Sequence, residues 1–508
     1  MRNTTYSCRS KISAIFTAAI LACTGGVFAQ PSTKTTSAVK ARRTPLVKLI
    51  ERVAESVVDI TTIKPIGGGR AVINNGTGSI LHETGYVITN NHVVSHGAHS
   101  QVTLSNGHVY RYRIVAKLPY EDLALVKIDS KESLRPVRLG RSNDLMLGES
   151  VLAVGNSHGL GHTVTPGIVS GLNRPTGPSA AARRTGMIQT NAAINPGNSG
   201  GPLFNALGEM IGVITLKATG ENISFAIAAD RLREVFPELM SVEQRYGFVL
   251  GMEVDTMGKA VKVTRVAKNS PAQTAGVRVG DEVFGAGKMT IHHGLDFYLS
   301  LIGQQVGSEF PLKLRRSGKH VNAVAKLGRC IVPPPVKIDK FKNGLHFSVY
   351  AGSWDKLPDF EKIKPIAAGV ANMFSHAAIA NIKDNFALRF TGLVKAPADG
   401  LYVFYTSSDD GSRLYIGDKL VVDNDGLHGV MEMGGLIRLS KGLYPITVTF
   451  FEKTGGEELK VFFEGPGLSK KEIPPAALFL RPPAKPSKTP MSRPARPRKP
   501  RGNRQNPS

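Results

Sequence analysis

The stretch NPGNSGGP, residues 195–202, sets one serine among glycines. Glycine tolerates backbone conformations in which successive N–H groups converge on one point. The N–H groups of Gly197 and Ser199, together with that of Asn198, are expected to form an oxyanion hole beside the Ser199 hydroxyl. A hydroxyl is a weak nucleophile at neutral pH, so catalysis also needs a base and an anion that orients this base.

Two side chains that precede Ser199 in the chain are suited to these roles. His92 follows the apolar run 86–88, and Asp122 opens the apolar run 123–126. A carboxylate at the mouth of an apolar strand is poorly solvated unless a partner such as a histidine N–H pairs with it. Each residue alone is typical of a turn or a cap, but the order His, Asp, Ser is that of chymotrypsin-type barrels. The three together predict a catalytic triad.

Short apolar runs recur from residue 76 to about residue 237, and Gly, Asn, Ser and Pro separate them. This pattern is typical of a barrel or sandwich of short strands. Apolar residues at helical spacing predict one helix at 45–58, and another segment, 231–240, closes the region. We therefore expect a mainly β fold.

The N-terminus predicts export. Basic residues precede the apolar stretch 12–29, which ends in small residues, as in a signal peptide over residues 1–29. A membrane anchor and a lipid-modified Cys23 are the alternatives, and the apolar run is short for a bilayer. Cleavage after residue 29 would leave Cys330 as the single cysteine, so no internal disulfide is expected.

The formal net charge of +25 is partly concentrated in residues 481–508, which contain Arg, Lys and Pro but no acidic residue. Such a segment cannot bury apolar surface and is expected to be disordered. It is either a solubilising tail or an electrostatic contact with a polyanion. For an exported protein we favour envelope polymers or anionic lipid and expect no nucleic acid.

Three segments resemble the catalytic blocks of the HtrA (Deg) family: residues 89–94 (TNNHVV), 122–128 (DLALVKI) and 192–203 (AAINPGNSGGPL). The resemblance covers roughly residues 53–240. It implies a chymotrypsin-like double β-barrel, and cleavage of unfolded or damaged envelope proteins without ATP or a cofactor. It also implies a periplasmic, envelope or secreted protein that forms a trimer or a multiple of one.

The same resemblance implies a specificity pocket for small or medium apolar side chains. Its expected residues are Ile194, Thr215, Leu216 and Lys217. The chain departs from the family in two places. Asn191 stands where Asp is common, and residues 157–159 read SHG where the family has PFG. Neither departure touches the triad, but both could alter the pocket or the oxyanion loop.

Residues 247–330 resemble a PDZ domain. Val249, Leu250, Gly251 and Met252 match the carboxylate-binding loop, whose N–H groups receive a chain terminus while the peptide adds to a sheet edge. Residues 270–281 match another recognisable stretch of the domain. Packing or assembly is the alternative role, and we favour capture of peptide C-termini.

Residues 344–480 resemble the β-sandwich first named from protective antigen toxin (PA14-like). Some members bind glycans through Ca²⁺ held by paired aspartates, and Asp409 and Asp410 stand at that place. Hard oxygen ligands suit Ca²⁺, and two adjacent carboxylates otherwise repel each other. An Asp-Asp-Gly turn without a metal is the alternative, and the sequence identifies no third ligand.

The expected organisation has seven segments. They are a signal peptide (1–29), a linker (30–44), a trypsin-like protease domain (45–240), a PDZ domain (247–330), a Pro-rich linker (331–343), the β-sandwich (344–480) and the basic tail (481–508). Together they predict an exported quality-control endopeptidase. The competing hypothesis is an envelope-binding or chaperone-like protein whose protease fold is catalytically idle.

Overall fold

The computed structural model describes residues 37–67, 70–94, 99–155, 163–176, 184–217, 223–338, 341–375, 382 and 384–481. The expected signal peptide, Cys23, the segment 157–159 and the basic tail beyond Arg481 lie outside these residues. Strands dominate the described part, so the protein is mainly β, as the sequence predicted. Among the described residues, no helix combines the length and the apolar character that crossing a bilayer requires.

Two short helices precede the first barrel, α2 (Ser37–Arg42) and α3 (Pro45–Val53). The Thr44 side chain caps α3. The expectation that this helix continues to residue 58 was wrong, because strand β1 begins at Val57 after a single 3₁₀ turn. Val57 and Val58 are β-branched and fully buried, so they favour the sheet over the helix.

The first barrel is closed, with the strand order β1-β2-β3-β6-β5-β4. Its strands are β1 (Val57–Gly67), β2 (Arg70–His82), β3 (Tyr86–Thr89), β4 (His99–Thr103), β5 (Val109–Leu118) and β6 (Leu123–Ile128). Valine and isoleucine side chains from these strands fill its interior, among them Ile60, Ile80 and Val126.

A second barrel follows, with the order β11-β8-β9-β10-β13-β12 closed by pairing of β11 with β12 and extended by β7. Its strands are β7 (Arg138–Leu139), β8 (Ser150–Gly155), β9 (Thr163–Thr176), β10 (Arg184–Thr190), β11 (Pro202–Asn205), β12 (Glu209–Lys217) and β13 (Ser224–Ala228). Helix α4 (Ala229–Met240) packs its apolar side chains against the barrels. The two barrels give the chymotrypsin-like fold that the resemblance implied.

The next region is a small α+β domain that follows the short helix α5 (Val242–Tyr246). Its elements are β14 (Phe248–Val249), β15 (Met252–Val254), β16 (Val263–Val266), α6 (Pro271–Thr274), β17 (Glu282–Ala286), β18 (Met289–Thr290), α7 (Gly294–Ser300), β19 (Glu309–Arg316), β20 (Lys319–Lys326) and β21 (Gly328–Arg329). Strand β14 pairs with β21, β15 pairs with β16, and β18-β17-β19-β20 form the largest sheet.

The last region is a sandwich of two sheets around aromatic side chains such as Phe390, Phe404 and Phe450. One sheet has the order β23-β22-β24-β29-β26-β27 with β32 beside β24, and the other has the order β28-β25-β30-β31. The strands are β22 (Leu345–Ala351), β23 (Ala367–Ala371), β24 (Phe386–Ala396), β25 (Gly400–Asp409), β26 (Ser412–Ile416), β27 (Lys419–Asn424), β28 (Met431–Leu439), β29 (Gly442–Glu452), β30 (Glu458–Gly465), β31 (Leu468–Glu472) and β32 (Leu478–Phe479).

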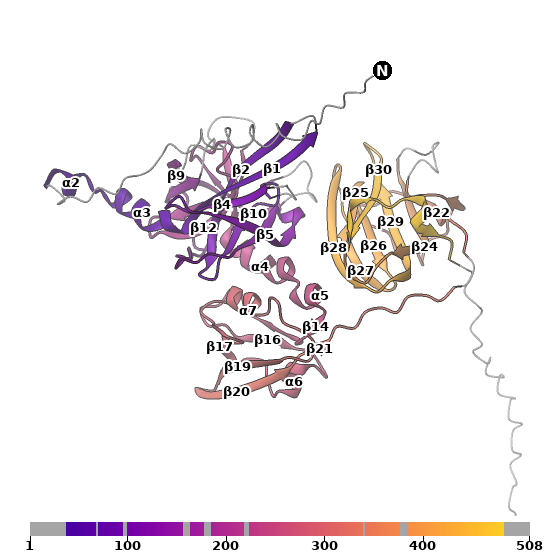
Figure 1. Cartoon of the computed structure of the whole chain (residues 1–508). Helices are drawn as coiled ribbons and strands as arrows, with labels where there is room; N and C mark the ends of the chain where they lie inside the picture. Colours follow the sequence, from indigo (N-terminus) through magenta and orange to yellow (C-terminus); the bar gives the residue numbers. More distant parts are fainter. Residues whose placement is uncertain are drawn as a thin grey trace, which may run out of the picture.

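Helices α4 and α5 lie between the double barrel and the PDZ-like region, with the sandwich beside them (Figure 1). Arg438 on β28 of the sandwich donates hydrogen bonds to the backbone carbonyls of Gln244 (2.9 Å) and Arg245 on α5. Helix α5 follows the double barrel and contacts both the PDZ-like region and the sandwich.

Candidate active site

His92 and Asp122 meet at the edge of the first barrel. His92 lies in the turn after β3, and Asp122 lies between the 3₁₀ turn η3 (Pro119–Glu121) and β6. His92 Nδ1 lies 2.8 Å from Asp122 Oδ2 and 3.0 Å from Oδ1, and the His92 backbone N–H donates to Oδ1 at 3.0 Å. Strands β3 and β6 are neighbours, with Thr89 opposite Ala124, so the barrel itself brings the two residues together. The imidazole is thereby fixed with Nε2 left for another partner.

Asp122 is held so that it remains charged. It adopts a left-handed conformation with φ of 57°, which aspartate tolerates better than most residues. Its side chain is 6% exposed, whereas that of His92 is 48% exposed. Burial raises the pKa of this carboxyl group, but the hydrogen bonds and charge of His92 and the hydrogen bond from Thr215 outweigh burial, so the pKa of Asp122 lies below its ordinary value. An ionised Asp122 can stabilise a protonated His92.

Thr215 connects Asp122 to Ser199. Its hydroxyl donates to Asp122 Oδ2 at 2.6 Å, and its carbonyl oxygen accepts a long hydrogen bond of 3.5 Å from Ser199 Oγ. Strand β2 of the first barrel also holds the loop that carries Ser199, because Thr77 N–H donates to the Ser199 carbonyl at 2.9 Å. Among the described residues, the Ser199 hydroxyl therefore bonds to Thr215 and not to His92. Hydrogen bonds of this kind commonly tighten only when substrate binds.

The loop around Ser199 presents two amides. Gly197 has a φ of 102°, and its carbonyl accepts a hydrogen bond of 2.7 Å from the Thr77 hydroxyl. In the described part of the chain, the N–H groups of Gly197 and Ser199 donate to no backbone oxygen. Both amides can therefore point toward an oxyanion.

Asn198 does not fit the role that we expected. Its N–H donates to the Asn195 carbonyl at 3.0 Å, and its side chain is almost fully buried. A Cβ atom on Gly155 would lie 2.7 Å from Asn198 Oδ1, so this side chain packs closely under strand β8. Asn198 thus shapes the turn, and its amide is already occupied.

The expected pocket residues have different positions. Ile194 is 3% exposed and belongs to the core of the second barrel. Thr215 is also buried, and its hydroxyl donates to Asp122, so only its backbone is left for the expected pocket edge, which stays a prediction. Leu216 and Lys217 pair with β13, and their side chains lie outside the described part. Asn191, the departure from the family, accepts a hydrogen bond of 2.8 Å from the Ile168 N–H and so ties the loop to β9.

Three family models match the chain in succession. Residues 76–213 match the trypsin-like peptidase domain, residues 248–327 match the PDZ domain, and residues 369–476 match the PA14 domain. The chain therefore combines a trypsin-like peptidase domain, a PDZ domain and a PA14 domain. In its first two domains this arrangement resembles the HtrA-type proteases.

Curated relatives match about half of the chain. The mitochondrial serine protease HTRA2 of Bos taurus is 34% identical over 295 residues, which are 53% of this chain and 64% of the relative. The periplasmic serine endoprotease DegP of Escherichia coli K12 is 36% identical over 269 residues, 50% of this chain and 56% of the relative. The chain thus spans less than two thirds of the length of these curated relatives. A solved structure of the HtrA-type protease AlgW with a tripeptide is 31% identical, with 57% of this chain and 98% of that chain covered and a TM-score of 0.35.

The carboxylate-binding loop of the PDZ domain lies between β14 and β15. The backbone N–H groups of Leu250 and Gly251 donate to Glu243 Oε1 at 2.9 and 2.8 Å. Val249 and Met252 belong to the two strands that flank these amides. Gly251 has a φ of 73°, and a Cβ there would lie 2.4 Å from Ser270 Cβ, so only glycine fits. The loop binds a carboxylate, and Glu243 supplies it.

In the sandwich, Asp409 and Asp410 meet a third acidic side chain, Glu452. One carboxylate oxygen from each lies within 4.8 Å of the others. Glu452 is fully buried, and neither of its oxygens has a hydrogen-bond partner. Burial, followed by the charges of Asp410 and Asp409, raises the pKa of Glu452 to about 8, and burial and Asp410 also raise the pKa of Asp409. The backbone N–H groups of His428 (2.9 Å) and Lys453 (3.0 Å) orient the two Asp410 oxygens.

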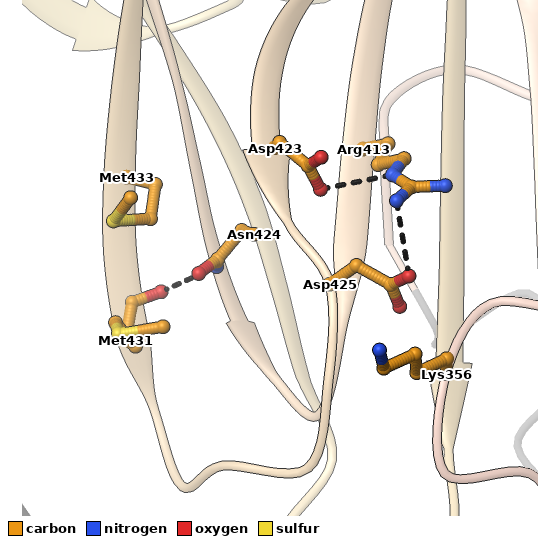
Figure 2. A pocket seen from close by; sticks show the side chains of 7 residues that line it. All are labelled: Lys356, Arg413, Asp423, Asn424, Asp425, Met431 and Met433. Atoms are coloured by element: carbon orange, nitrogen blue, oxygen red, sulfur yellow. Dashed lines mark hydrogen bonds and ion pairs between the residues drawn. The ribbon is translucent and has the colours of Figure 1, made fainter. Parts of the chain in front are cut away.

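A pocket of about 310 Å³ lies near this acidic cluster. Figure 2 shows Arg413 bound to Asp423 and Asp425, with two methionines on the opposite side. The pocket is lined by Lys356, Arg413, Asp423, Asn424, Asp425, Met431 and Met433. Its Asn424 carbonyl is within 3.0 Å of His428 Nε2, and His428 N–H reaches Asp410. The loop that carries His428 therefore contacts both the pocket and the acidic cluster.

The sequence did not reveal Glu243 or Glu452 as site residues. Glu243 lies on a short helix before the PDZ domain, and Glu452 lies 42 positions beyond Asp410 at the end of β29. The one available signal was at Glu452, an acidic residue that directly follows 446–451 (ITVTFF), a run of β-branched and aromatic residues. Both roles depend on tertiary contacts.

Proposed function

We propose that this protein is an exported serine endopeptidase that cleaves unfolded or damaged envelope proteins. The observation that carries the proposal is the buried, ionised Asp122 bound to His92 Nδ1, with Thr215 connecting Asp122 to Ser199. Such an arrangement orients an imidazole for proton transfer from a serine hydroxyl.

The reaction follows from these positions. Ser199 Oγ attacks the peptide carbonyl while His92 Nε2 removes the hydroxyl proton. The N–H groups of Gly197 and Ser199 stabilise the oxyanion, and each such donor contributes roughly 3 kcal/mol in comparable enzymes. His92 then donates its proton to the leaving amine, and water releases the acyl group by the same steps in reverse order. Asp122 holds the Nδ1–H tautomer throughout.

The cellular setting is part of the proposal. The relative named periplasmic DegP supports export to the periplasm or cell envelope, as does the signal-like N-terminus. The PDZ domain would receive peptide C-termini, and a trimer or multiple of one follows from the family resemblance. The basic segment 481–508 would contact anionic envelope polymers.

Casein digestion tests the protease. Purified full-length protein is incubated with unfolded casein beside the Ser199→Ala variant and a Ser440→Ala control in a sandwich turn. We expect cleavage by the parent and the control but not by Ser199→Ala. Equal behaviour of all three proteins would favour the competing function, an envelope-binding or chaperone-like protein with an idle protease fold.

We further propose that the sandwich holds Ca²⁺ through Asp409, Asp410 and Glu452 and binds an envelope glycan beside it. The support is the fit of the residues: three converging carboxylates, one of them fully buried with both oxygens unpartnered. A hard divalent cation would neutralise the repulsion among them. The pocket in Figure 2 offers charged and amide groups next to methionines, a surface suited to a polar ligand with apolar faces.

A thermal shift experiment tests the metal proposal. Ca²⁺ is added to chelator-treated full-length protein, to Glu452→Gln and to Asp418→Asn, a control at an exposed turn. Stabilisation of the parent and the control, but not of Glu452→Gln, is expected. A shift that persists in Glu452→Gln and in Asp409→Ala/Asp410→Ala would remove these carboxylates from the metal site. A glycan array probed with and without Ca²⁺ then identifies the sugar.

A further inference from the structure

The carboxylate-binding loop of the PDZ domain is already filled by the chain itself. Glu243 Oε1 accepts hydrogen bonds from Leu250 N–H (2.9 Å) and Gly251 N–H (2.8 Å). These are two of the amides that a PDZ loop offers to the carboxylate of a peptide terminus. Glu243 lies on α5, which precedes the PDZ domain, so a residue from outside the domain occupies its carboxylate-binding loop.

The backbone places Glu243 at the loop. Ser241 (φ 37°) and Gly247 (φ 75°) both adopt left-handed conformations and bend the chain at the two ends of α5. The Arg245 side chain donates to the Met240 carbonyl at 2.8 Å and fixes α5 to the end of α4. Arg438 of the sandwich binds the carbonyls at the other end. The helix is therefore held on both sides, and its single glutamate faces the loop.

Glu243 is nevertheless displaceable. In the described part of the chain its side chain forms no ion pair, and the side-chain hydrogen bonds are the two from the loop amides. The nearby Arg265 is paired with Glu253 on β15 instead. A flexible side chain that depends on two amides can rotate away when a better-placed acceptor arrives.

We propose that Glu243 is an internal competitor for the peptide site, which a free chain-terminal carboxylate must displace. This inference rests on the proposed capture of peptide C-termini by the PDZ domain. One pair of amides cannot serve both carboxylates, so the apparent affinity for a peptide is reduced by the fraction of molecules in which Glu243 occupies the loop. The site then selects extended segments with a free C-terminus and binds them with a reduced apparent affinity.

Peptide binding and amide exchange test this competition. All proteins are full-length and carry Ser199→Ala, so that the peptides stay intact. Glu243→Ala removes the competitor, Glu243→Gln leaves a weaker neutral acceptor, and Glu253→Ala removes a matched carboxylate from the adjacent strand. The probe is a pool of labelled decapeptides with three randomised C-terminal residues, prepared with free and with amidated C-termini. Binding is followed by fluorescence anisotropy.

Glu243→Ala should bind the free-carboxylate pool roughly tenfold more tightly than its parent, with Glu243→Gln between them and Glu253→Ala unchanged. Hydrogen exchange at Leu250 and Gly251 should be faster in Glu243→Ala without peptide. Equal binding by Glu243→Ala and the parent, or an equal gain for the amidated pool, overturns the inference. Binding by none of the proteins overturns both peptide capture and the competition. A failed casein digestion, in contrast, overturns only the proposed protease activity of Ser199 and leaves the peptide-binding result unaffected.

Discussion

Asp122 in the protease and Glu452 in the sandwich are both buried carboxylates, but their surroundings are opposite. Asp122 accepts hydrogen bonds from the His92 ring, the His92 backbone and Thr215, and its pKa is lowered. Glu452 has no partner at hydrogen-bond distance and angle, receives only a weaker favourable contribution from the Asp410 backbone, and faces two aspartates, so its pKa is raised to about 8. The first site supplies all the partners its charge needs. The second needs a proton or a cation from outside.

The largest expected effect is at the satisfied site. Asp122→Asn keeps the side-chain shape but removes the charge and favours the wrong tautomer of His92. We expect kcat for casein or a peptide substrate to fall about 10⁴-fold, as replacement of the triad aspartate does in serine proteases. Steady-state kinetics at pH 7 measure this change, with Asp129→Asn at an exposed position as the control. A fall of less than tenfold would show that Asp122 does not govern His92.

The next effect concerns the unsatisfied site and its dependence on pH. Because the folded pKa of Glu452 lies above its ordinary value of 4.5, the folded state binds this proton more tightly than the unfolded state. This stabilisation is complete below about pH 4.5 and is lost as pH rises through about 8. In calcium-free buffer, the contribution of Glu452 to the free energy of unfolding of the sandwich should therefore fall by roughly 2–4 kcal/mol over that pH range.

Scanning calorimetry between pH 5 and pH 8.5 in the presence of a chelator measures how the stability of the sandwich depends on pH. Glu452→Gln, which is neutral at every pH, should flatten the dependence, and so should added Ca²⁺. Parallel pH profiles for Glu452→Gln and the parent would mean that Glu452 is stabilised by a partner in the folded state, and the contrast with Asp122 would then disappear.

A smaller effect should follow from weakening the satisfied site by one donor. Thr215→Val keeps the shape of the side chain but leaves Asp122 Oδ2 without this hydroxyl. A hydrogen bond to a charged group is worth about 1.5–3 kcal/mol, so kcat/KM should fall roughly 10- to 100-fold, while Thr215→Ser retains most of the activity. Equal loss in the serine variant would assign the effect to packing and not to the hydroxyl.

The sequence predicted those parts of the molecule that depend on local patterns. The glycines around Ser199, the apolar run before His92 and the apolar run after Asp122 indicated the barrels, because strand periodicity is visible in the chain. The end of helix α3 was misplaced because the residues after 53 suit either a helix or a strand until the sheet forms. The hydrogen bond of Thr215 to Asp122 could not be predicted, because the two residues belong to different barrels and lie 93 positions apart in the chain.

The contacts of Glu243 and Glu452 could not be predicted for a related reason. Glutamate before a loop or at the end of a strand is ordinary on a protein surface, and no spacing rule brings it to a particular partner. Glu243 reaches the loop only because α5 is bent at Ser241 and Gly247, and Glu452 is buried only because β24 and β26 flank β29.

The hydrogen bonds of Arg438 to α5 have a practical consequence for anyone who dissects this protein. The Pro-rich segment 331–343 looks like a neutral place to shorten the gene, because it joins two domains. A product that ends there would lose the guanidinium that satisfies the Gln244 and Arg245 carbonyls, and the last turn of the helix carrying Glu243 would fray. Peptide affinities measured on such a fragment would describe the fragment, and Arg438→Gln in the intact chain is the fairer comparison.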